Sequence, residues 1–339
     1  MDDHLNADCP FPDDRFEGRG IVLCGGGEAY FPSIWVCVNM LRSLGCRLPI
    51  ELWYLGRAEM NRAMIELLEP LDVVARDAFA VEKTYPMERL GGWELKPYAL
   101  VHSRFEDVLY IDADNVPLRN PEFLFESAAF KKTGALFWPD RCRNAEGQNF
   151  LSRKAWDLLG LPYRDEPEFE SGQLVLRKKQ VWKALQLTLH LNSHSDFYYR
   201  YFYGDKDTFH LAWRRLEQPF QLMPHPPQSL KNDLGMVQFD ENGDALFCHL
   251  CALKWNLHHV HRDVAEYPFA EPACRFLIEL RRVWNGEVRP LPSAFSDSEK
   301  AAFEEIVSFG QYRLVDEKGR GHVLSLAPSF ALESGEPFL

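Results

Sequence analysis

Short apolar runs alternate with segments of helical spacing through the first 115 residues, and this order constrains the fold more than any other feature of the chain. The expected strands are GIVLC, PIELWYLG, DVVARD and DVLYID, and the expected helices lie at 31–45, 57–71 and 93–105. Strands and helices that alternate at this spacing build a parallel sheet with helices on its faces. The sequence therefore predicts a Rossmann-like α/β half whose ligand site lies at the carboxyl ends of the strands.

The order of elements is less regular beyond this half, which predicts a mixed α+β second half. Further strands are expected at 134–140, 169–178 and 245–255, and further helices at 149–161, 178–192, 206–216 and 272–286. We expect a polar leader at 1–17, a main domain at 18–288 that divides into halves at 18–115 and 116–288, and a tail at 289–339. The tail carries one amphipathic stretch at 298–310, and no function is assigned to it.

Composition and charge exclude several classes of protein. Hydrophobic residues make up 46% of the 339 residues, which is enough apolar material for a core. The formal net charge of -12 repels phosphate backbones, so nucleic acid is not an expected partner. No run approaches the ~18 apolar residues that span a bilayer, and the acidic start of the chain lacks the features of a signal peptide.

The eight cysteines are scattered through mostly apolar segments instead of forming a disulfide framework. This pattern indicates free thiols in a reducing compartment, so we expect a cytoplasmic protein. A lumenal location such as the Golgi is the alternative if the sequence is a trimmed piece of a membrane-anchored protein.

Three consecutive glycines, Gly25, Gly26 and Gly27, follow the first expected strand. Glycines at a strand end let the backbone approach a nucleotide closely and expose N–H groups at the start of a helix. The dinucleotide-binding fingerprint is incomplete, because Tyr30 stands near the place of its third glycine and no acidic residue ends the second strand. The glycines therefore predict either a nucleotide contact or a plain structural turn.

Asp112, Ala113 and Asp114 follow the buried run VLYI at the end of the fourth expected strand. Side chains two residues apart at a strand end project the same way, and two close carboxylates repel unless they share a cation or a proton. A hard divalent cation held there, Mg²⁺ or Mn²⁺, neutralises a diphosphate and acts as a Lewis acid. The alternative is that the carboxylates only cap the following turn. Asp107, before the strand, is expected to be a surface residue.

Two long segments carry a resemblance to a known family. GIVLCGGGEAYFPSIWVCVNMLRSLGCRLPIELWYLG and GWELKPYALVHSRFEDVLYIDADNVPLRNPEFLF resemble the opening unit and the Asp-x-Asp region of the fungal-type α-mannosyltransferases, relatives of the glycogenin-like enzymes with the GT-A fold. The similarity covers roughly residues 18 to 260. It implies a retaining transfer of a hexose from a nucleotide donor to a hydroxyl group, with a divalent metal that is usually Mn²⁺.

The resemblance also implies roles for residues near the end of the domain. In FCHLCALKW, His249 matches the third metal ligand, and an imidazole beside two carboxylates favours Mn²⁺ over Mg²⁺. A lysine that contacts the diphosphate follows this histidine by six residues in glycogenin-like enzymes, whereas Lys254 follows by five. A zinc half-site at CHLC is a competing interpretation, but the sequence lacks a second pair of ligands at matching spacing.

Further candidates come from segments that line the donor sugar in the family. In FESGQLVL, Gly172 is expected to let the sugar approach the backbone and Glu170 or Gln173 to lie close to the anomeric carbon, or else the segment is only a tight turn into a strand. Asp207 in FYGDKDTFHLAW is expected to hydrogen-bond the transferred sugar or the acceptor, and its alternative role is a helix N-cap.

Two further features have open interpretations. Lys96 in ELKPYAL either meets the donor phosphates or is a solvated helix start. The aromatic run at 197–203 either stacks on an acceptor sugar or belongs to the core.

Together these features predict a metal-dependent retaining glycosyltransferase that uses GDP-mannose and a glycan acceptor. A UDP-hexose donor is the alternative within the class. Retention proceeds either by front-face return or through a covalent intermediate on a carboxylate such as Glu170. Two other classes remain: a sugar nucleotidyltransferase, although GGGEAYFP has an acid where a basic loop is wanted, and a catalytically silent glycan-binding relative.

Overall fold

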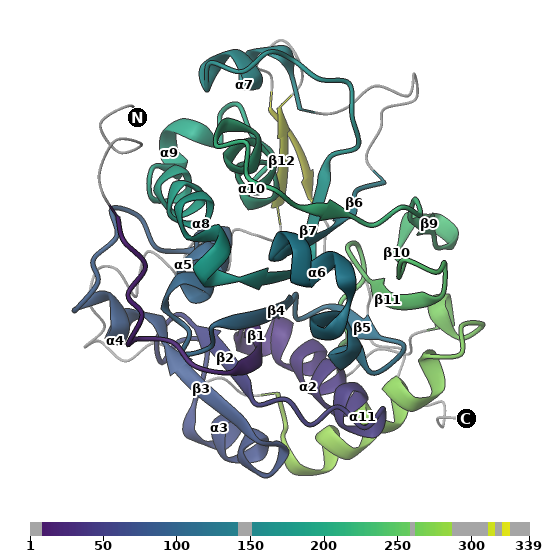
Figure 1. The fold of residues 1–339 in the computed structure, drawn as a ribbon. Helices are drawn as coiled ribbons and strands as arrows, with labels where there is room; N and C mark the ends of the chain where they lie inside the picture. The colour runs from purple at the N-terminus through teal and green to yellow at the C-terminus, as the bar shows by residue number, and fades with distance from the viewer. Residues whose placement is uncertain (1–8, 142–150, 258–261, 287–310, 316–320, 326–339) are drawn as a thin grey trace. The chain divides into compact units, whose positions relative to one another are not determined.

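A seven-stranded sheet with the order β3-β2-β1-β4-β7-β6-β8 forms the centre of the main part of the protein (Figure 1). The computed structural model describes residues 9–141, 151–257 and 262–286 together with two strands at 311–315 and 321–325. The strands of the large sheet are β1 (Arg19–Cys24), β2 (Ile50–Tyr54), β3 (Val73–Asp77), β4 (Asp107–Ile111), β6 (Ala135–Pro139), β7 (Phe169–Arg177) and β8 (Gln221–Leu222).

The strands β3, β2, β1 and β4 run parallel to one another, whereas β7 pairs antiparallel with both β4 and β6. All five residues of β2 and of β4 are buried. Parallel strands covered on both faces consist of continuous apolar runs of this kind. The predicted fold class, a Rossmann-like and mostly parallel sheet with a mixed second half, is confirmed.

Helices cover both faces of the sheet. α2 packs against α11 on one face, and α8 packs against α5 and α10 on the other (Figure 1). The helices are α2 (Gly27–Ser43), α3 (Arg62–Leu68), α4 (Ala78–Glu82), α5 (Leu95–His102), α6 (Ala128–Thr133), α7 (Arg153–Leu158), α8 (Lys178–Ser193), α9 (Ser195–Tyr198), α10 (Asp205–Arg215) and α11 (Ala270–Val283). Short 3₁₀ helices lie at Glu69–Leu71, Gly92–Glu94, Pro121–Glu126, Lys231–Asp233 and Arg262–Val264.

A second sheet, with the order β5-β11-β10-β9, packs beside the large one and was not expected from the sequence as a unit. Its strands are β5 (Asn115–Pro117), β9 (Gln228–Ser229), β10 (Met236–Phe239) and β11 (Ala245–His249). Trp138 of β6 joins the two sheets, because its ring packs edge-on against Phe247 at 5.7 Å and its Nε1 donates to the carbonyl of Phe239 at 2.8 Å. The small sheet starts directly after Asp114, so the two sheets meet at the candidate site.

Asp107 is buried, which corrects its assignment to the surface. The residue is only 7% exposed, and its carboxylate accepts hydrogen bonds from Arg177 at 2.9 and 3.1 Å. The position at the start of β4, opposite Arg177 in the antiparallel pairing with β7, explains the burial.

Residues 293–339 form a compact unit separate from residues 1–292. This unit contains an antiparallel pair, β12 (Gln311–Val315) and β13 (Gly321–Ser325), where no strands were predicted. The amphipathic stretch predicted at 298–310 lies outside the described residues. Within the part of the chain that the structure describes, no helix combines the length and the apolar character needed to cross a bilayer.

Candidate active site

The loop that carries Asp112 and Asp114 is fixed on both sides by backbone hydrogen bonds. The N–H of Asp112 donates to the carbonyl of Gly172 on β7 at 2.7 Å, and the carbonyl of Asp114 accepts from the N–H of Leu250 at 3.1 Å. A loop held by its backbone presents its side chains in a set direction. The two carboxylates therefore have defined positions at the carboxyl end of β4.

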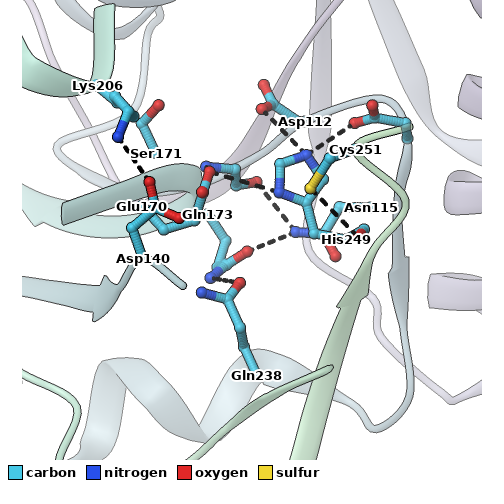
Figure 2. A network of polar contacts seen from close by, with 12 residues as sticks. Asp112, Asn115, Asp140, Glu170, Ser171, Gln173, Lys206, Gln238, His249 and Cys251 are labelled. Carbon is cyan, nitrogen blue, oxygen red and sulfur yellow. Dashed lines mark hydrogen bonds and ion pairs between the residues drawn. The ribbon is translucent and has the colours of Figure 1, made fainter. Parts of the chain in front are cut away.

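His249 reaches the two carboxylates because β11 pairs antiparallel with β5, with His249 opposite Asn115. Its Nε2 lies 3.3 Å from Oδ1 of Asp114 and 3.8 Å from Oδ2 of Asp112. One potential ligand atom from each of the three side chains lies within 4.8 Å of the others. The structure thus brings together the three residues that the sequence proposed as metal ligands. Figure 2 shows Asp112 and His249 of this group.

The surroundings of His249 fit a metal ligand. The ring turns Nε2 toward the aspartates, while Nδ1 lies 3.4 Å from Oε1 of Glu170. Histidines that bind metals commonly have a carboxylate or carbonyl on the second ring nitrogen, which orients the ring. Gly172 makes room for this arrangement, because a Cβ atom there would lie 2.4 Å from Nδ1. Glu170 therefore supports the histidine, a position that the sequence did not predict.

The site contains more carboxylates than ammonium groups. The carboxylates of Asp112 and Asp205 face the ammonium group of Lys96, and that of Asp114 faces Lys254. A fourth carboxylate, that of Glu170, faces the ring of His249. Burial and the nearby Asp114 raise the pKa of Asp112 against the opposing effect of Lys96. Burial also acts to raise the pKa of Asp114, but Lys254 and His249 outweigh it and hold that pKa below its ordinary value. The excess of negative charge favours a bound cation.

The pKa of His249 is likewise set by burial and by neighbouring groups that act in opposite directions. Burial acts to lower its pKa, but Cys251 and Asp114 outweigh burial and hold the pKa well above its ordinary value. A proton on this ring and a metal ion compete for the same nitrogen, since only neutral imidazole binds metals. The two oxygen donors and one nitrogen donor suit Mn²⁺ or a similar divalent ion.

Lys96 is buried, with its side chain 7% exposed, so the alternative of a solvated helix start is wrong. Its Nζ donates to the carbonyl and the hydroxyl of Ser171 at 3.0 and 2.9 Å, and it lies 2.9 Å from Oδ2 of Asp205 and 3.2 Å from Oδ1 of Asp112. A phosphate contact by Lys96 stays a prediction, and in this structure the ammonium group is already surrounded by oxygen atoms of the protein.

Lys254 reaches the site despite its shorter spacing from His249. Its Nζ pairs with Oδ2 of Asp114 and donates to the carbonyl of Cys251 at 3.0 Å. The following residue is tied to α2, because the N–H of Trp255 donates to Oγ of Ser33 at 3.2 Å. Lys254 thus lies beside the candidate metal ligands, a position that is compatible with the predicted contact to the diphosphate.

The glycine turn lies beside the Asp-x-Asp loop, since a Cβ on Gly25 would lie 3.6 Å from that of Ala113. Gly25 and Gly27 adopt φ values of 141° and 71°, which favour glycine. A Cβ on Gly26 would lie 2.7 Å from that of Glu59. These requirements explain all three glycines as a structural turn, and a nucleotide contact stays a prediction.

Gln173 and Glu170 lie on β7 but have different environments. The Gln173 side chain is fully buried: its Oε1 accepts from Asn115 at 2.6 Å and its Nε2 donates to Gln238 at 2.5 Å (Figure 2). Oε1 of Glu170 also accepts from the N–H of Gly172 at 2.8 Å. Gln173 therefore braces Asn115 next to the aspartates, and its predicted catalytic role would require breaking these contacts.

Asp207 lies in the first turn of α10, where its Oδ2 accepts from the N–H of Tyr203 at 2.6 Å. The N-cap of α10 is Gly204, so the alternative of an N-cap at Asp207 is wrong, and the predicted catalytic role is untested. Burial, together with Glu168 and Asp140, raises the pKa of Asp207 to about 7 against the opposing effect of Lys206. Asp205, two residues earlier, makes the contact with Lys96.

Sequence reasoning missed three residues of the polar network: Ser171, Asp205 and Asn115. Asp205 and Ser171 were quoted within motifs but not selected. The only available signal was the clustering of polar residues in two otherwise apolar segments, and it does not distinguish Asp205 from Asp207.

Comparisons with known proteins show the family to which the chain belongs. The model of a family described as putative mannosyltransferases matches residues 18–152 and 163–234, which is more than half of the chain. The chain belongs to this family.

Its relatives include fungal enzymes. The chain is 30% identical over 240 residues to the alpha-1,2-mannosyltransferase MNN24 of Candida albicans, covering 60% of this chain and 34% of the relative. It is 25% identical over 241 residues to the alpha-1,2-mannosyltransferase MNN2 of Saccharomyces cerevisiae, covering 58% and 40%. The chain thus spans about a third to two fifths of the length of these relatives.

Among solved structures, the galactosyltransferase LgtC in complex with donor and acceptor sugar analogs matches with a TM-score of 0.48 and 13% identity. The match covers 78% of this chain and 100% of that chain.

Proposed function

We propose that this protein is a metal-dependent retaining glycosyltransferase of GT-A architecture that transfers mannose from GDP-mannose to a hydroxyl group of a glycan. The observation that carries the proposal is the convergence of Asp112, Asp114 and His249 at the carboxyl end of β4. Ligands bind at this end of the strands in open α/β sheets. Membership of the putative mannosyltransferase family supports the sugar, and a UDP-hexose donor is the second candidate.

The three ligand residues hold the cation, and the two lysines have separate roles. When bound there, Mn²⁺ supplies a Lewis acid that stabilises the diphosphate leaving group. Lys254 lies beside Asp114 with its side chain 28% exposed, and it offers a point charge to the phosphates. Lys96 is buried and orients Asp112 through its contacts with Ser171 and Asp205.

The contacts of Glu170 support front-face return over a covalent intermediate on this residue. Its carboxylate already accepts from Gly172 and faces His249, so an attack on the sugar would release both partners. In front-face return the bond from the anomeric carbon to the phosphate oxygen breaks, and the acceptor oxygen bonds to the same face. The acceptor proton passes to the departing phosphate oxygen.

A panel of nucleotide sugars with Mn²⁺ tests the proposed function. We expect GDP-mannose to raise the melting temperature and to be hydrolysed slowly without an acceptor. Asp112→Asn should abolish hydrolysis, because it removes a charged metal ligand, whereas Asp233→Asn should behave like the wild type, because the Asp233 side chain is 83% exposed.

Each result of this panel discriminates between functions. Stabilisation and hydrolysis with a UDP-hexose alone would replace the mannose assignment by the second donor. Release of pyrophosphate from a nucleoside triphosphate and a sugar phosphate would indicate a nucleotidyltransferase. A protein that no nucleotide sugar stabilises, and in which Asp112→Asn changes nothing, is not a glycosyltransferase.

A further inference from the structure

Trp93 and Tyr203 form an exposed aromatic pair. Their ring centroids lie 6.2 Å apart with an interplanar angle of 37°, and the two residues are 36% and 50% exposed. By contrast, Tyr198 and Phe202 of the same aromatic run are buried. The structure therefore divides the run at 197–203, which the sequence treated as one unit, and adds Trp93 from a distant segment.

The aromatic pair adjoins the polar network of the candidate site. Trp93 lies in the 3₁₀ helix Gly92–Glu94, directly before α5 and Lys96, and Tyr203 lies two residues before Asp205. The ion pair between Lys96 and Asp205, at 2.9 Å, joins the two segments. Lys96 also contacts Asp112, so this one side chain connects the two segments that carry the aromatic pair to a candidate metal ligand.

The two rings are held in place by a close backbone contact. A Cβ on Gly204 would lie 2.7 Å from the Trp93 ring, and Gly204 has a φ of 69°. Only glycine allows this approach without strain, so the segment around Tyr203 is fixed against Trp93. The N–H of Tyr203 is fixed as well, because it donates to Asp207 at 2.6 Å.

The size and chemistry of this surface match a sugar ring better than a protein. Two rings exposed to this degree offer on the order of 200 Å² of aromatic surface, from side chains of about 150 to 250 Å² each. A standard protein interface needs about 800 Å² from each partner. A charged side chain lies next to one of the rings, with Nζ of Lys206 5.7 Å from the Tyr203 centroid. A pyranose presents apolar C–H faces for stacking and hydroxyl groups for such polar neighbours.

We propose that Trp93 and Tyr203 form the binding platform for a pyranose ring of the acceptor glycan. The platform rests on the proposed function, because its place beside Lys96 and Asp205 matters only if a sugar is transferred there. It binds acceptor and makes no contact with the metal, so its loss weakens acceptor binding and leaves reaction with water intact.

Binding of methyl α-D-mannopyranoside, measured by saturation-transfer NMR with Mg²⁺ and GDP present, tests the platform without requiring turnover. Trp93→Ala and Tyr203→Ala should each reduce the saturation transfer about fivefold, which corresponds to the binding free energy that one aromatic contact contributes. Trp93→Phe should restore part of it. Tyr85→Ala is the matched control, because Tyr85 is 41% exposed but stacks on His102 away from the pair.

Two results would overturn the platform: unchanged saturation transfer in both alanine variants, or none from the wild type at millimolar sugar. Donor hydrolysis in the absence of acceptor separates this question from the proposed function. Normal hydrolysis in Trp93→Ala with weakened sugar binding supports both inferences. Sugar binding that depends on Trp93 in a protein that hydrolyses no nucleotide sugar supports the platform and contradicts the transferase.

Discussion

The Nζ atom of Lys96 lies 2.9 Å from Oδ2 of Asp205 and 3.2 Å from Oδ1 of Asp112, in a site where the lysine side chain is only 7% exposed. One ammonium group thereby joins the start of α5, the Asp-x-Asp loop and the start of α10. A buried charge shared among three segments makes their positions interdependent.

The pair of Lys96 and Asp205 should show strong energetic coupling. Lys96→Met leaves the buried carboxylate of Asp205 and the half-buried carboxylate of Asp112 without their counter-charge and should lower the free energy of unfolding by about 3 to 5 kcal/mol. Asp205→Asn in the same background should cost much less than it does alone, with a coupling of about 1 to 3 kcal/mol. Urea unfolding of the four proteins of the double-mutant cycle measures this coupling. Additive effects would show that the ion pair has no energetic role.

His249→Ala should weaken Mn²⁺ binding by at least about 100-fold, because loss of an outer-shell partner alone costs 10 to 100-fold. Isothermal titration calorimetry with MnCl₂ gives the affinity directly. His225→Ala serves as the control, since that ring packs against the turn at Gly243 and should leave the affinity unchanged. Equal Mn²⁺ affinities in the wild type and His249→Ala would remove His249 from the metal site.

Gly172→Ala should displace His249, because the added Cβ would lie 2.4 Å from Nδ1 of the ring. We expect a fall in Mn²⁺ affinity of about tenfold, comparable to loss of an outer-shell contact. Gly20→Ala is a matched control for overpacking: its Cβ would lie 2.3 Å from the Phe105 ring, away from the metal ligands. The control should lose stability but keep its metal affinity. The same affinity loss in both variants would indicate a general effect of destabilisation.

Glu170→Gln distinguishes a support for His249 from a nucleophile. As a support, Glu170 should contribute about tenfold to Mn²⁺ affinity, and excess Mn²⁺ should restore most of the activity of the variant. A nucleophile would give the opposite pattern, with unchanged metal affinity and activity that no Mn²⁺ concentration restores. Steady-state rates across a Mn²⁺ titration separate the two.

Glu59, beside the glycine turn, should make stability fall as the pH rises. Burial raises its pKa from 4.5 to about 7 in the folded protein. The folded protein therefore keeps a proton that the unfolded chain releases, so stability is lost between about pH 4.5 and 7. Glu59→Gln should remove up to about 3 kcal/mol of this loss. Its amide oxygen can still accept from the N–H of Leu55, as Glu59 does. Parallel stability curves from pH 5 to 8 for both proteins would contradict this expectation.

The sequence predicted the first half of the fold well, because the patterns that specify its strands and helices are local. Each buried strand is a short apolar run and each long covering helix has its own spacing, so β1 to β4 and the helices α2, α3 and α5 follow from neighbouring residues. The short helix α4 was not predicted. The Asp-x-Asp pair was predictable for the same reason, since it directly follows β4. Boundaries were less accurate: α2 begins at Gly27, four residues before the predicted start.

Burial and pairing of charged side chains were not predictable from local pattern. Asp107 and Lys96 are polar residues at the ends of elements, where either exposure or burial fits the sequence. Their partners Arg177 and Ser171 lie 70 and 75 residues further along the chain. The choice between Asp205 and Asp207 has the same origin, because two carboxylates in one helical turn point in different directions and only packing decides which one meets Lys96.

By itself, the sequence determined the α/β order and the place of two carboxylates at a strand end. Tertiary structure decided what surrounds them: β11 pairs with β5 and brings His249 to Asp114, and Lys254 reaches the same carboxylate from 140 residues away. Residues this far apart meet only when the sheets pack against each other, and that packing depends on the whole core. Hydrophobic periodicity, by contrast, is determined by a few neighbouring residues.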